Sequence, residues 1–201
     1  VTNEFVYVPI PESRPMQPEL ATPYAAVSPA LAAFATRHPG ASRPAVTLPS
    51  ELATQNMHLD PDFSQLTYGD SGTRRGRGLT SLGAGDIVVF YGGLRPVTAC
   101  EHRLLYALLG LYRVEKVLRA GELGEAERQA NAHTRCVAIE PSDVIVRADP
   151  RTSGRLDRCI PIGEFRDRAY RVERCVLSEW GGLSCRDGYL QRSAVLPTIL
   201  N

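Results

Sequence analysis

Two β-rich segments that follow each other closely restrict the fold more than any other feature of the chain. Residues 87–92 have the sequence IVVFYG, and residues 104–118 have the sequence LLYALLGLYRVEKVL. Large apolar residues recur at alternate positions of the second segment, and Gly110 in its middle disfavours a helix. The linker is too short for the crossover helix that parallel strands need. We therefore predict that residues 87–91 and 106–117 form adjacent antiparallel strands at the centre of a curved sheet, with a bulge at Gly110.

The remaining elements are predicted to be shorter. Further strands are expected at residues 5–11, 143–148, 158–163 and 169–177. Ser28, followed by proline, is typical of a helix start and opens an Ala-rich helix to Thr36, while residues 121–133 are expected to form a surface helix. Residues 11–62 form a proline-rich excursion of loops around the first helix. We predict one α+β domain, residues 1–201, with a curved or barrel-like mixed β-sheet and two or three flanking helices.

Charge, hydropathy and cysteine usage exclude several classes of protein. The net charge is +1, but residues 1–73 have an acidic excess and residues 74–201 a basic one, and 22 of the 23 basic residues are Arg. No apolar stretch approaches the roughly 20 residues of a spanning helix, and no signal peptide is expected. The five cysteines are an odd number without a CxxC pair, which is typical of a reducing compartment. We expect a cytoplasmic protein that does not bind membranes.

Catalytic and metal-binding signatures are missing. The sequence contains no GxSxG, P-loop, HExxH or GxGxxG motif that opens a helix. Cys100 and His102 lie close together, but no second ligand pair at zinc-finger spacing accompanies them. We therefore predict no metal and no cofactor, and we favour a protein that is not an enzyme.

A glycine-rich segment with clustered arginines is a candidate nucleic-acid contact. Residues 67–78 have the sequence TYGDSGTRRGRG, in which Arg74, Arg75 and Arg77 can neutralise phosphates while glycines allow close approach of the backbone. The alternative is a solvated, flexible loop.

Several aromatic residues are candidates for holding a base. Alternation along the strand at 87–92 places Phe90 and Tyr91 on opposite faces, so at least one is expected at the rim of the sheet. Trp180 lies in the segment EWGG, which is predicted to be a loop, and burial in the core is less expected there than in a strand. Aromatic side chains around a small cleft hold flipped or single-stranded bases. Ordinary core packing is the alternative for each of them.

Ordered blocks of sequence resemble a known family. GDIVVFYGG followed by LLGLYRVEKV resembles the central strands of PUA-like barrels, which include the EVE, ASCH and YTH domains that hold modified or flipped bases. The blocks FVYVPIPES, HLDPDFSQLTYGD, LGAGDIVVFYGGL, LLGLYRVEKV, DPRTSGRLDRCIPIG and LQRSA are similar, in this order, to the third of the numbered nucleotide modification associated domain families. They cover most of residues 5–194. The resemblance implies a PUA-like fold and a role near bacterial or phage base-modification or restriction systems, but no particular reaction.

The first functional hypothesis is a binding module for a modified base in a nucleic acid or a free nucleotide. Its base-binding residues are predicted to be an aromatic clamp with two polar edge readers: Tyr68, Phe90, Tyr91, Trp180, Asp70 and Gln191. Its phosphate-binding residues are predicted to be Arg74, Arg75, Arg77 and Arg192.

The second hypothesis is an enzyme that acts on a nucleotide or modified base. His58, Asp60 and Asp70 fall within thirteen residues and can supply acid–base chemistry, although loop capping and Asx-turns around Pro61 are the favoured explanation for them. Convergence of His58 and Asp70 within hydrogen-bond reach in a cleft would favour the enzyme, whereas their separation on the rim would favour the binding module. A third possibility is an interaction scaffold without a ligand.

Overall fold

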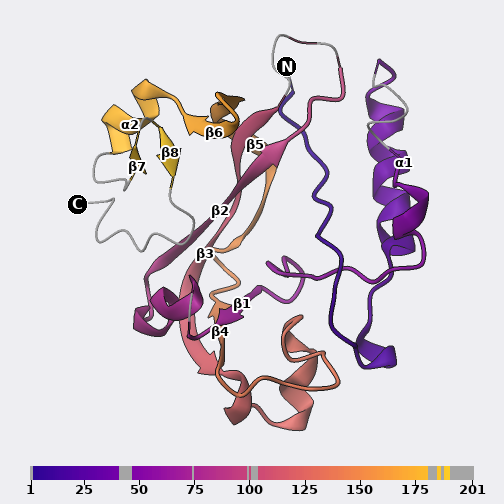
Figure 1. Cartoon of the computed structure of the whole chain (residues 1–201), viewed down its shortest axis with the longest axis vertical. Coiled ribbons are helices and arrows are strands. Elements are labelled where there is room, and N and C mark those ends of the chain that lie inside the picture. Colours follow the sequence, from indigo (N-terminus) through magenta and orange to yellow (C-terminus); the bar gives the residue numbers. More distant parts are fainter. Residues whose placement is uncertain are drawn as a thin grey trace.

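The fold is organised around one long strand. The computed structural model describes residues 2–40, 47–73, 75–98, 100, 104–180, 185–186 and 188–190. Strand β3 (Leu105–Arg119) pairs antiparallel with β2 (Ile87–Leu94), as predicted, and the two cross the centre of the molecule in Figure 1. The register shifts where Phe90 pairs with Gly110 and the next residue pairs with Leu108. The extra residue of this bulge lies next to Gly110, where the bulge was expected.

The other strands extend the sheet from β3. Strand β4 (Asp143–Ala148) pairs with the C-terminal part of β3, and β5 (Gly154–Arg166) pairs with its N-terminal part. Strands β1 (Thr67–Ser71) and β6 (Ala169–Val172) then add to β4 and β5. The sheet order is β1-β4-β3-β5-β6, with β2 on β3, and every pairing is antiparallel. The α+β class is confirmed, but the sheet is antiparallel instead of mixed and does not close into a barrel.

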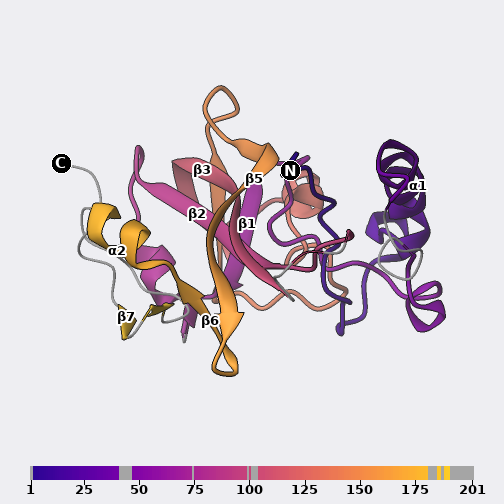
Figure 2. The ribbon, with the colours of Figure 1, turned by 90° about the horizontal axis from the view of Figure 1, so that it is seen from above.

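Two α-helices lie at opposite ends of the molecule (Figure 2). Helix α1 (Ser28–Arg37) matches its prediction and buries Leu31 and Phe34. Helix α2 (Arg174–Trp180) replaces the second half of the strand predicted at 169–177. Val176, Leu177 and Trp180 recur at helical spacing and pack against a core cluster around Ile162, so tertiary packing overrides the β propensity of this segment.

Short 3-10 helices connect these elements. They are η1 (Pro18–Leu20), η2 (Tyr24–Val27), η4 (Ser50–Leu52), η5 (Arg75–Ser81), η6 (Ala120–Glu122) and η7 (Glu125–Ala130). The surface helix predicted at 121–133 is thus wrong, because the extended backbone of Gly124 separates η6 from η7. A small hairpin of β7 (Cys185–Arg186) and β8 (Tyr189–Leu190) follows α2. No helix in the described part of the chain is long and apolar enough to cross a membrane.

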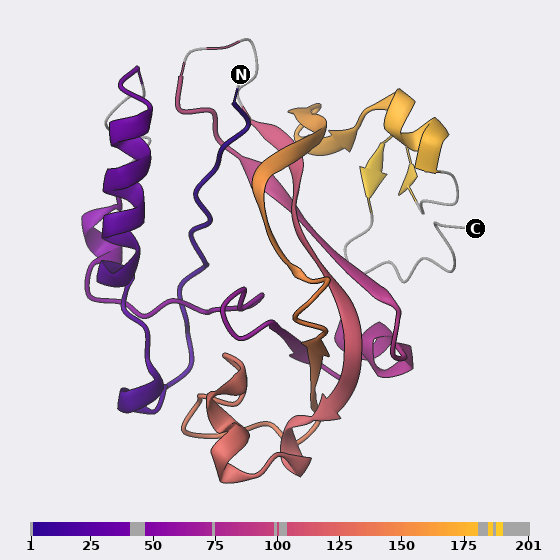
Figure 3. The same ribbon diagram turned by 180° about the vertical axis from the view of Figure 1, so that it is seen from behind.

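The N-terminal segment runs between the sheet and α1 (Figures 1 and 3). The strand expected at residues 5–11 is not formed; only Glu4 bridges to Arg158, and Pro11 to Met57. The prolines in this segment have no N–H to donate to a ladder. The segment is instead held by side chains such as Tyr24, which is fully buried and donates its hydroxyl to the carbonyl of Pro9 at 2.6 Å.

Two isoleucines on β5 provide a matched test of where the core lies. Ile162 is 1% exposed and Ile160 is 51% exposed. We expect Ile162→Ala to lower the free energy of unfolding by about 2–5 kcal/mol, because it removes a buried side chain and leaves a cavity. Ile160→Ala should change it by less than about 0.5 kcal/mol. Urea unfolding measures both changes in free energy. Equal effects of the two substitutions would contradict the conclusion that Ile162, and not Ile160, faces the core.

Candidate functional site

His58 is positioned by a short pairing of two loop segments. The amide of His58 donates to the carbonyl of Ile10 at 2.8 Å, and the amide of Glu12 donates to the carbonyl of Asn56 at 2.9 Å. This places the Glu12 carboxylate beside the imidazole, whose Nδ1 donates to Glu12 Oε2 at 2.6 Å. Burial raises the pKa of Glu12, but hydrogen bonds from His58 and from the amide of Arg14 outweigh it and hold the pKa below its usual value. With the proton of a neutral ring on Nδ1, His58 Nε2 carries a free lone pair.

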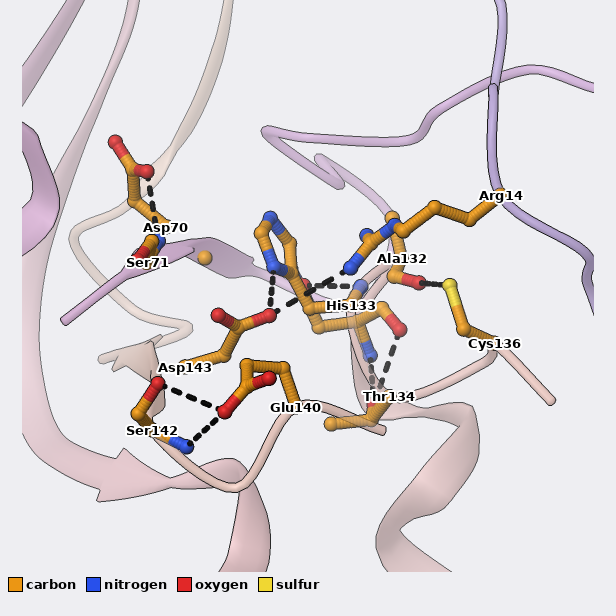
Figure 4. Close-up of polar contacts among 12 residues, drawn as sticks. Arg14, Asp70, Ser71, Ala132, His133, Thr134, Cys136, Glu140, Ser142 and Asp143 are labelled. Carbon is orange, nitrogen blue, oxygen red and sulfur yellow. Dashed lines mark hydrogen bonds and ion pairs between the residues drawn. The ribbon is translucent and has the colours of Figure 1, made fainter. Parts of the chain in front are cut away.

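His133 is held in the same way. Its Nδ1 donates to Asp143 Oδ2 at 2.5 Å, at the start of β4 (Figure 4). The Arg14 guanidinium lies 3.6 Å from the same carboxylate oxygen and 3.5 Å from Glu12 Oε1, so it bridges the carboxylates behind the two rings. Burial lowers the pKa of His133 and favours the neutral ring, although the bond to Asp143 opposes this.

Asp60 lies between the two imidazoles. Its Oδ1 accepts hydrogen bonds from the amide of Gly69 at 2.7 Å and from Asn131 Nδ2 at 3.1 Å. Its Oδ2 faces His58 Nε2 at 3.9 Å and His133 Nε2 at 3.8 Å. Burial raises the pKa of Asp60 to about 8, although both hydrogen bonds favour the charged form. We call His58, Asp60 and His133 the His–Asp–His centre.

Asn131 joins this centre to the sheet. Its side chain is fully buried, and Nδ2 donates to Thr67 Oγ1 as well as to Asp60, while Oδ1 accepts from the amide of His133. One buried amide therefore positions both the carboxylate and the second imidazole. It passes so close to β1 that a Cβ on Gly69 would lie 2.6 Å from Asn131 Oδ1 and 2.9 Å from His133 Cδ2.

The third residue of the predicted catalytic set lies elsewhere. Gly69 faces the centre, so strand alternation turns Asp70 to the other face of β1. Its carboxylate accepts from the amide of Ser71 at 2.7 Å, as Figure 4 shows. His58 and Asp60 therefore converge with His133. The convergence of His58 with Asp70 that was to favour an enzyme over a binding module is not found. His133 was not among the predicted site residues, because it falls at the end of the segment predicted to be a surface helix. It is one of only four histidines in the chain, which is the signal by which it could have been found.

The predicted aromatic clamp separates into two groups. Tyr68 and Phe90 pack together, with ring centroids 5.3 Å apart, in a core cluster that includes Tyr112. Tyr91 and Trp180 are partly buried and pack against a different core cluster, formed around Ile162. The structure thus places the four aromatic residues in two separate clusters, with two residues in each. Their base-binding role stays a prediction.

The predicted phosphate contacts are only partly within the described residues. Arg77 is exposed on η5, which begins at Arg75. Arg74, Gln191 and Arg192 lie outside the described residues, as does His102, so no arrangement is assigned to them. Their roles stay predictions.

A groove of about 760 Å³ lies on the other side of the chain segment that carries Asp60. Leu59, Pro61 and Asp62 line it, together with Tyr7 and Arg155, whereas none of the three residues of the His–Asp–His centre does. The groove and the centre are therefore separate features of the same segment.

Comparison with protein families adds an independent observation. The family model described as "Nucleotide modification associated domain 3" matches residues 1–184, which include the whole His–Asp–His centre. The chain belongs to this family. The resemblance deduced from the sequence blocks is thereby confirmed. Neither the comparison with curated proteins nor that with solved structures found a match.

Gly69 allows a direct test of how closely the centre is packed. Gly69→Ala should lower the free energy of unfolding by about 1–3 kcal/mol, because the new methyl group collides with Asn131 and His133. Gly83→Ala is the matched control, since nothing lies within 4 Å of a Cβ there. Urea unfolding and the imidazole NMR signals of His133 measure the two effects. Unshifted His133 signals in Gly69→Ala would contradict this geometry.

Proposed function

We propose that this protein is an enzyme that acts on a nucleotide or a modified base at the His–Asp–His centre. The observation that carries the proposal is the orientation of the two imidazoles: each Nδ1 is held by a buried carboxylate, so each Nε2 faces the shared Asp60. Membership of a nucleotide modification associated family supports the substrate class.

The hydrogen bonds behind the rings favour a chemical role over simple packing. An imidazole whose Nδ1 proton is held by a carboxylate has an Nε2 that accepts a proton from a substrate or water. The side chains of His58 and His133 are 16% and 13% exposed, so solvent reaches the rings although their carboxylate partners are buried. His58 and His133 are then the candidate general bases, and Glu12 and Asp143 are positioning residues.

A second function, recognition of a modified base, is supported by Tyr91 and Trp180. Both are partly buried in one cluster with Tyr170, at the end of the molecule that carries α2 (Figure 1). Stacking against such side chains is tolerant of sequence and contributes roughly 1–3 kcal/mol per base. Binding of a base by these side chains does not exclude a reaction at the His–Asp–His centre of the same protein.

The enzyme is tested by product formation. The full chain is incubated with nucleotides and with modified and unmodified oligonucleotides, and mass spectrometry detects changes in mass. His58→Gln and His133→Gln should each lower the rate by about 10²–10⁴-fold, because each removes a candidate proton acceptor. His38→Gln is the control: His38 pairs with Glu4 at 3.1 Å, outside the centre. Turnover that survives both substitutions in the centre would contradict the proposal.

The recognition function is tested by salt dependence. Replacing Arg74, Arg75 and Arg77 by Ala should reduce the slope of log K against log salt by about 2, because each lost phosphate contact removes about 0.7 on single strands. Trp180→Ala should abolish the preference for modified over unmodified oligonucleotides and leave the slope unchanged. Absence of binding by the wild-type protein at low salt would contradict the nucleic-acid hypothesis.

A further inference from the structure

We infer that His58 Nε2, His133 Nε2 and Asp60 Oδ2 bind one divalent transition-metal ion. The three ligand atoms lie within 4.8 Å of one another, and Asp60 Oδ2 is 3.9 Å and 3.8 Å from the two nitrogens. These separations are too long for hydrogen bonds. A tetrahedral ion with bonds of about 2.0–2.1 Å separates its ligand atoms by about 3.3–3.4 Å. An inward movement of a few tenths of an ångström in each side chain brings all three into coordination.

The atoms behind the ligands are arranged as metal sites require. A ligating histidine almost always donates its other ring N–H to a carboxylate, a carbonyl or water, which fixes the tautomer and raises the basicity of the ligand. Glu12 does this for His58, and Asp143 does it for His133. Asp60 is oriented through its other oxygen by Gly69 and Asn131. Each outward-facing atom is satisfied, and the three remaining atoms face one another.

The charge balance also favours a dication. The carboxylates of Glu12, Asp60 and Asp143 surround two imidazoles, and Arg14 is the cation that contacts this group among the described side chains. Counted as formal charges, the three carboxylates and one guanidinium leave an excess of two negative charges, and without an ion burial opposes this excess by raising the pKa of Asp60. Buried charges are costly unless they are compensated, and a divalent ion compensates this excess.

The donor set selects the class of metal. Imidazole nitrogens suit Zn²⁺, Fe²⁺ and related ions, whereas Mg²⁺ and Ca²⁺ prefer sites made only of oxygen. Three protein ligands leave a coordination position for water or substrate, which is the arrangement of catalytic sites. Coordination uses the Nε2 lone pairs that the catalytic proposal assigns to proton transfer, so in the metal-bound protein His58 and His133 are ligands and not general bases. The inference concerns binding of the ion alone and does not depend on the proposed reaction.

The test uses untagged full-length protein from which metal has been removed with a chelator. Titration calorimetry with Zn²⁺ should give one ion per chain, and Co²⁺ should develop the visible absorption of a nitrogen-ligated ion. His58→Gln and His133→Ala should each raise the Kd for Zn²⁺ by at least about 100-fold, and Asp143→Asn by about 10–100-fold, because a neutral amide oxygen orients and polarises the His133 ring less strongly than a carboxylate does. His38→Ala, which removes a histidine paired with Glu4 elsewhere, should leave the Kd unchanged.

Two outcomes overturn the inference. One is a wild-type protein that binds neither ion with a stoichiometry of one; the other is an affinity that His58→Gln and His133→Ala lower no more than His38→Ala does. Circular dichroism of the metal-free variants separates loss of a ligand from loss of the fold, and the milder Asp143→Asn gives a second measurement if His133→Ala does not fold. Because no substrate is present, failure here is distinguishable from failure of the catalytic proposal.

Discussion

The backbone pairing of β3 is the constraint on which the rest of the structure depends. This fifteen-residue strand pairs with β2 and β5 along its N-terminal part and with β4 along its C-terminal part. Strand β4 in turn carries β1, with Gly69 paired to Ile145. The start of β4 supplies Asp143, and β1 supplies the amide that binds Asp60. The candidate site is therefore built on β4, which pairs with the C-terminal end of β3, and on β1, the next strand beyond it.

The loops that complete the site are tied to this scaffold by buried polar groups. Asn131 makes hydrogen bonds to Asp60, Thr67 and His133 and is fully buried. A buried amide is costly unless its donors and acceptor are paired, and here they are paired with residues of the centre. Neighbouring Asp62 and Arg135 form a further buried ion pair at 2.6 Å. Such networks define one arrangement of the loops more sharply than apolar packing does.

The catalytic and metal proposals use one part of the molecule, and the recognition proposal uses another. The His–Asp–His centre lies against β1 and β4, whereas Tyr91 and Trp180 lie in the cluster beside α2. Under these proposals the reactive groups and the stacking groups lie in separate parts of the molecule. Phosphate and base contacts would then position a substrate, and an ion held by the two imidazoles would supply the chemistry.

The sequence by itself determined the elements whose signals are local. Period-two alternation and a short linker were enough for the hairpin of β2 and β3, and a Ser-Pro start followed by alanines was enough for α1. Two of the three residues of the centre were also visible, because His58 and Asp60 are near each other in the chain. Ordered blocks of sequence identified the family.

Only the tertiary structure decided the rest. His133 joins His58 through contacts between residues 75 positions apart, and Glu12 reaches His58 across 46 positions. Asp70 was excluded by strand alternation, which depends on the face that β1 turns to Asn131. Trp180 joined a helix because its neighbours pack on the cluster around Ile162. In each case the arrangement is stabilised by burial and hydrogen bonding between segments that are distant in the sequence. Local patterns of residues do not predict which distant segments pair.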